Sequence, residues 1–72
     1  MQQEKFETAQ EILEPLVVVY PERNDLRVNY AIALVNTGHL DDARFHAQAV
    51  LKNMPNNPTA LELMGILNAP EQ

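Results

Sequence analysis

Residues 24–57 read NDLRVNYAIALVNTGHLDDARFHAQAVLKNMPNN, and this stretch recurs in weakened form on both sides of itself. Pro21 and Pro55 are as far apart in the chain as Ala9 and Ala43. Few paired residues are identical, but size and polarity are kept in Phe6 with Leu40, Leu16 with Val50, Tyr30 with Met64, and Ala31 with Gly65. An internal period of about 34 residues is typical of repeat architectures, so the fold is expected to be a stack of similar units.

Apolar residues within each period recur at spacings of three and four, which predicts amphipathic helices. We expect four of them: over about residues 5–20, from a cap at Asn24 or Asp25 to about residue 36, over 41–53 and over 58–69. Pro15 lies inside the first and removes one backbone hydrogen bond, so a bend is expected there.

The ends of these helices carry recognisable signals. Pro21 cannot continue the first helix, and Gly38 offers the left-handed conformation that ends the second. Asn24 or Asp25 is expected to cap the start of the second helix, and Pro58 suits the first position of the fourth. The short connections then make neighbouring helices antiparallel. The expected fold class is all-α, with four helices stacked as antiparallel hairpins in one domain over residues 1–72.

The composition excludes several classes of protein. A formal net charge of −5 opposes a phosphate backbone, so no nucleic acid partner is expected, and a helix-turn-helix DNA binder is disfavoured. The longest apolar run, Leu16 to Tyr20, is too short to span a membrane, and the N-terminus has no signal-peptide pattern. We therefore expect a soluble, cytoplasmic chain without membrane insertion. The 72 residues contain no cysteine, so packing against neighbours must supply the stability that a small core lacks.

Residues 24–57 resemble the tetratricopeptide repeat, whose pattern is W-x2-L-G-x2-Y, then A-x3-F, then P within a unit of about 34 residues. The matching positions are Arg27-x2-Tyr30-Ala31-x2-Leu34, the turn Thr37-Gly38-His39-Leu40-Asp41-Asp42 with Ala43, and Pro55. The departures are Arg27 for Trp, Tyr30 for Leu, Ala31 for Gly, and Ala47 for Phe. Residues 2–23 resemble the second half of a preceding repeat, and residues 58–69 resemble the first half of a following one.

The resemblance implies a scaffold for protein–protein interactions, because first helices in this family line a concave groove, and we expect this groove to be mainly apolar. The residues implied to face it are Asp25, Val28, Asn29, Ile32, Val35 and Asn36 from the central repeat, with Thr59, Glu62 and Ile66 from the next helix. Some members of the family clamp a peptide carboxylate with Lys, Arg and Asn, and only Asn29 fits such a clamp. An amphipathic helix or an extended apolar peptide is the partner expected here.

Two alternatives to this groove stay open. An apolar stripe on one helix is common in stacked helices as a contact with the adjacent repeat. The chain is also compatible with a structural or oligomerisation segment, since the first and last helices each lack a hairpin partner in the repeat register. Two copies are then expected to self-associate by covering each other's end helices, unless the first helix serves as a cap or the segment belongs to a longer chain.

Residues for chemistry are sparse. His39 and His46 are seven positions apart, too far to bind one metal ion together, and are expected to be surface or interface residues. The sequence offers no Ser-His-Asp or Cys-His set, and its two glycines do not form a phosphate loop. We therefore expect no enzyme activity, no cofactor and no metal.

Overall fold

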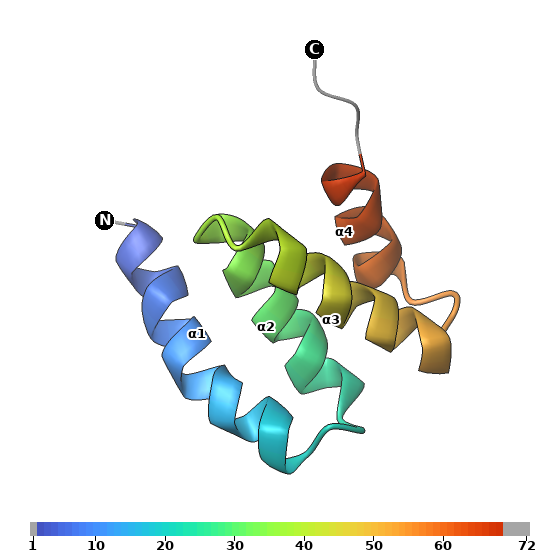
Figure 1. Cartoon of the computed structure of the whole chain (residues 1–72), viewed down its shortest axis with the longest axis horizontal. Coiled ribbons are helices and arrows are strands. Elements are labelled where there is room, and N and C mark those ends of the chain that lie inside the picture. The colour runs from blue at the N-terminus through green and yellow to red at the C-terminus, as the bar shows by residue number, and fades with distance from the viewer. Residues whose placement is uncertain (1, 69–72) are drawn as a thin grey trace.

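The computed structural model describes residues 2–68, and in this part of the chain it contains four α-helices and no strand (Figure 1). The helices are α1 (Gln2–Val19), α2 (Asn24–Asn36), α3 (Leu40–Asn53) and α4 (Pro58–Leu67). The all-α prediction is confirmed, and α1 continues across Pro15. The predicted end of the last helix, at residue 69, lies outside the described residues, and α4 ends at Leu67.

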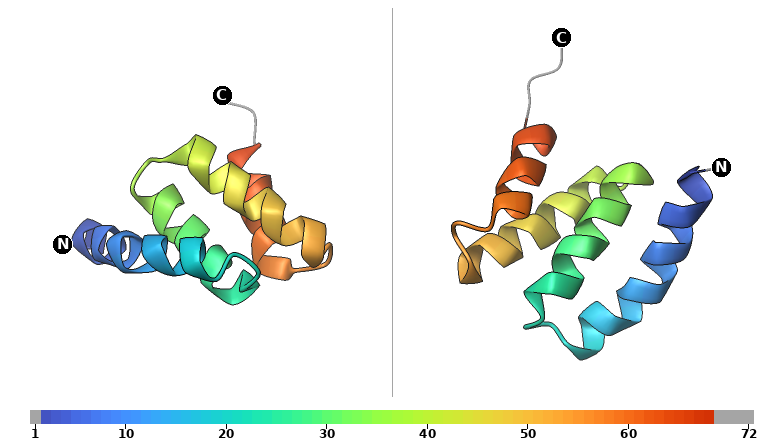
Figure 2. Two further views of the ribbon diagram at one scale, coloured as in Figure 1. Left: turned by 60° about the horizontal axis from the view of Figure 1, so that its bottom comes forward. Right: turned by 180° about the vertical axis from the view of Figure 1, so that it is seen from behind.

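Helix α2 occupies the centre of the arrangement, where it packs against α1, α3 and α4. Within residues 2–68, the backbone of α1 comes close only to that of α2, whereas α3 lies against both α2 and α4. Seen from behind, α2 has α1 on one side and α4 on the other (Figure 2, right). The helices therefore form successive hairpins, as the short connections predicted.

Gly38 lies in the turn after α2 and stops this helix, as predicted. Its φ is 86°, and its amide donates to the Val35 carbonyl at 3.2 Å while the His39 amide donates to the Leu34 carbonyl at 2.8 Å. These two bonds satisfy carbonyls that the helix end leaves open, and glycine adopts the left-handed conformation without steric cost.

Helix α4 begins at Pro58, which occupies the first turn as predicted. The side-chain oxygen of Asn57 accepts a hydrogen bond from the Ala60 amide at 2.9 Å, so Asn57 is the N-cap. This cap was not among the predicted ones, although asparagine before a proline-started helix is a favourable combination.

The predicted cap of α2 was wrong. Arg23 is the N-cap residue and makes no capping bond from its side chain, and Asn24 is already helical. The Arg23 guanidinium instead donates to the Asp25 carboxylate at 2.8 and 3.0 Å. This exposed pair lowers the pKa of Asp25, first because Arg23 donates a hydrogen bond to the carboxylate.

The core consists of three neighbouring clusters of apolar side chains. The first joins α1, α2 and α3 through Val17, Tyr30, Leu34 and Ala43. The second and third join α2, α3 and α4 through Val28, Val50 and Ala60, and through Ala31, Ala47 and Leu63. Since alanines supply much of this core, the helices approach one another closely.

Candidate functional site

The surface predicted to bind a partner lies on α2 and α4, and the structure exposes only part of it. The exposed members are Asp25, Asn29, Asn36, Glu62 and Ile66, the half-buried ones are Ile32, Val35 and Thr59, and Val28 is buried. Ile66, at 57% exposure, is the one large apolar side chain among the exposed members.

Val28 is a correction to the predicted site. Its side chain is 8% exposed and packs with Val50 of α3 and Ala60 of α4, so it lies in the core and offers little surface to a partner. Ile32 packs against this cluster and the neighbouring one, and Val35 also packs against two clusters. These apolar residues of α2 therefore pack against the helices that follow it in the chain. The surface left exposed is therefore mainly polar, not mainly apolar as predicted.

Five of the predicted residues, each exposed or half-buried, define what we call the α2–α4 face: Asn29, Ile32, Asn36, Glu62 and Ile66. On α2 the spacings of three and four put Asn29, Ile32 and Asn36 on one side, and Glu62 and Ile66 are four apart on α4. Asn36 donates from its side-chain amide to the Ile32 carbonyl at 2.9 Å. This bond holds Asn36 along the helix and keeps the half-buried Ile32 beside it.

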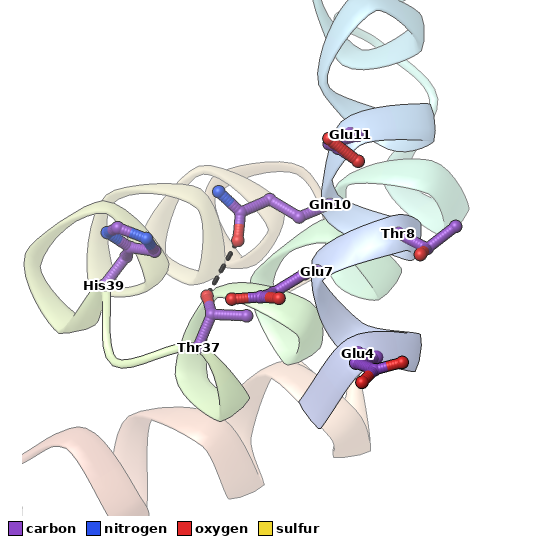
Figure 3. Close-up of a pocket in the computed structure, with 7 residues that line it drawn as sticks. All are labelled: Glu4, Glu7, Thr8, Gln10, Glu11, Thr37 and His39. Carbon is purple, nitrogen blue, oxygen red and sulfur yellow. Dashed lines mark hydrogen bonds between the residues drawn. The ribbon is translucent and has the colours of Figure 1, made fainter. Parts of the chain in front are cut away.

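A hollow of about 440 Å³ lies elsewhere, between α1 and the turn after α2. Its walls are formed by Glu4, Glu7, Thr8, Gln10, Glu11, Thr37 and His39. Figure 3 shows Glu7 and Gln10 of α1 pointing toward Thr37, with His39 beyond them. The Thr37 hydroxyl donates to the Gln10 side-chain oxygen at 2.7 Å, so this contact joins α1 to the turn. The hollow was not predicted, because it depends on how α1 sits beside a turn that is distant in the sequence.

His46 is a half-buried titratable side chain with three side-chain neighbours. Its ring meets Tyr30 edge-on, with the ring centroids 4.9 Å apart, and Phe45 at 5.1 Å. An Arg27 nitrogen lies 3.4 Å from its Nδ1. Burial lowers the pKa of His46, the nearby Arg27 cation lowers it further, and Asp42 acts in the opposite direction.

Arg27 explains one departure from the family pattern. At the position of the pattern's tryptophan, it donates to the Pro21 carbonyl at 2.8 Å as well as contacting His46. Arg27 thus links the α1–α2 connection to α3 through polar contacts. The family pattern has an aromatic ring that would pack at this position. His46 is accordingly an interface residue, and His39 is exposed in the turn.

Within residues 2–68, no three His, Asp or Glu side chains are grouped so that they could hold a metal ion. None of the described helices combines the length and the hydropathy that a membrane crossing requires.

Comparison with known proteins addresses the whole chain. A sequence model described as "Tetratricopeptide repeat" matches residues 1–67. No curated protein and no solved structure matches the chain significantly. The repeat match spans nearly all of the sequence and agrees with the observed stack of helical hairpins, so the chain belongs to the tetratricopeptide repeat family.

Proposed function

We propose that this chain is a protein-interaction scaffold that binds a partner peptide or helix on the α2–α4 face and catalyses no reaction of its own. Repeats of this family generally mediate protein–protein interactions and are typically not enzymes. The observation that carries the proposed site is Ile66, a large apolar side chain that is 57% exposed on α4, a helix that packs against α2.

The chemistry of the face favours a particular partner. Each of the amides of Asn29 and Asn36 has donors and an acceptor, which suit the backbone or the polar side chains of a peptide. Ile66, with the edge of Ile32, offers a contact for an apolar side chain. Glu62 and the net charge of −5 oppose an acidic peptide. The favoured partner is therefore a neutral or basic peptide with an apolar anchor, bound extended or as an amphipathic helix.

The test uses peptides selected from a displayed library on the immobilised chain. Affinity of a recovered peptide is then measured by fluorescence anisotropy for the wild-type chain and for Ile66→Glu. Burying an isoleucine side chain stabilises by about 1.5–3 kcal/mol, so we expect binding to weaken at least about tenfold.

The matched control is Val18→Glu, which places the same charge on a residue of α1 that is 74% exposed and away from this face. It should bind the peptide like the wild type, and circular dichroism should show equal helix content in all three chains. Recovered peptides that bind Ile66→Glu and the wild type equally would refute the proposed site.

A second function, self-association, is favoured by a separate observation. Large apolar side chains are also exposed on the outer sides of α1 and α4, among them Ile12 and Leu61. Under this alternative the chain is an oligomerisation segment, and the α2–α4 face has no ligand of its own.

A further inference from the structure

The repeat allows each end helix, α1 and α4, to be compared with a helix of the central α2–α3 hairpin. Shifting the chain by one repeat, so that Pro21 falls on Pro55, places α1 on α3 and α2 on α4. In this register Ala9, Leu13 and Leu16 correspond to Ala43, Ala47 and Val50. The three residues of α3 are fully buried between α2 and α4. Their counterparts on α1 are only half-buried, because α1 packs on α2 from one side alone.

Helix α4 shows the complementary exposure. Its Leu61, Met64 and Gly65 correspond to Arg27, Tyr30 and Ala31 of α2. In α2, Tyr30 is buried in a cluster with residues of α1 and α3, and Ala31 is buried in a cluster with residues of α3 and α4. In α4, Leu61 is 49% exposed and Gly65 is exposed as well. Among residues 2–68, nothing thus covers the side of α4 that corresponds to the α3-facing side of α2.

Gly65 supports this interpretation independently. A Cβ at this position would meet nothing within 4 Å, so none of the described residues requires a glycine there. Glycine in a helix interior is less stable than alanine. At the corresponding position, Ala31 is fully buried in a cluster with Ala47 of α3. A glycine here suits the close approach of another helix.

The outer side of α1 has a composition that suits such an approach. Ala9, Ile12, Leu16 and Val19 follow one another at spacings of three and four and form what we call the outer stripe. Ile12 is 58% exposed and Val19 is 64% exposed. The four glutamates of α1, at positions 4, 7, 11 and 14, share a different side of the helix. The glutamate carboxylates of α1 are therefore kept off this stripe.

We propose that the outer stripe of α1 in one copy packs on Leu61, Met64 and Gly65 of α4 in a second copy, as α3 packs on α2 within the chain. In the repeat register, the α1 stripe and the α4 face are the two surfaces that meet inside one hairpin, and each chain carries both. A second copy can therefore supply the surface that either end helix lacks, so the partner is a second copy. The inference rests on the second proposed function, self-association, and the contact does not use the α2–α4 face. Since the two faces differ, the contact is head-to-tail.

The test measures molar mass by sedimentation equilibrium over a range of chain concentrations. The wild type should rise above 8.1 kDa with concentration, while Ile12→Glu and Leu61→Glu should each remain at 8.1 kDa. The matched controls are Val18→Glu and Ile66→Glu, which carry the same change on other sides of the same helices and should associate like the wild type. Circular dichroism checks that every variant keeps its helices.

Mixing the two defective variants is the decisive measurement. Ile12→Glu leaves the α4 face intact, and Leu61→Glu leaves the outer stripe of α1 intact. The mixture should therefore form a one-to-one dimer, although neither variant associates alone. A wild type that associates but is unaffected by Leu61→Glu, or a mixture that stays monomeric, overturns the head-to-tail contact and leaves self-association standing. A wild type that stays monomeric throughout overturns both and leaves these faces to a different helical neighbour.

Discussion

His46 connects the chemistry of one residue to the stability of the α2–α3 hairpin. Its folded-state pKa lies below the ordinary value of 6.5, first because of burial and then because of Arg27. Well above pH 6.5 the ring is neutral in both the folded and the unfolded chain, so His46 does not lower the free energy of unfolding there. As pH falls, the unfolded chain takes up the proton first, so stability is lost. We expect the urea midpoint to be lower at about pH 5.5 than at about pH 7.5.

Two substitutions separate this effect from other titrations. His46→Gln should reduce the difference between the two midpoints, because it removes the group whose pKa changes on folding. His39→Gln alters an exposed histidine in the turn and should keep the wild-type difference. If the two variants show the same pH dependence, the neighbourhood of His46 is not its source.

At the scale of one element, α4 depends on its cap. The Asn57 side chain accepts from the Ala60 amide at 2.9 Å, and replacing such a cap by alanine costs about 1 kcal/mol. Asn57→Ala should therefore lower the free energy of unfolding by about that amount in urea titration. Asn56→Ala, an exposed asparagine in the same connection, is the control and should change it much less. Equal losses for the two variants would show that the cap contributes nothing specific.

The element scale also shows what sequence can predict. Gly38 and Pro58 were predictable because each acts through the backbone geometry of its own residue type. The start of α2 was not, since a one-residue difference in where the helix begins decides which side chain can cap it. Val28 was misplaced for another reason. A helical period shows which residues share a side, but only packing shows that Val50 and Ala60 come close enough to cover it.

At the scale of the whole molecule, small residues set how the helices fit together. Five alanines in three helices are at most 1% exposed: Ala31, Ala33, Ala43, Ala47 and Ala60. One cluster brings α2, α3 and α4 together through Ala31, Ala47 and Leu63. Because its members come from three helices, a change of volume there alters both hairpin contacts at once. The departure of Ala47 from the family's phenylalanine is therefore part of a closer packing.

The last prediction reverses the usual effect of restoring a family residue. Ala47→Phe adds a ring at a site with no exposed surface, and overpacking of this kind typically costs about 1–3 kcal/mol, with larger values where the backbone must move. A chain of 72 residues has little stability to lose, so we expect a large drop in thermal midpoint or loss of cooperative unfolding by circular dichroism. Gln48→Phe, at the adjacent exposed position, is the control and should stay folded. A more stable Ala47→Phe chain would mean that the three helices can separate enough to admit the ring, and that the alanine-lined contact does not determine their spacing.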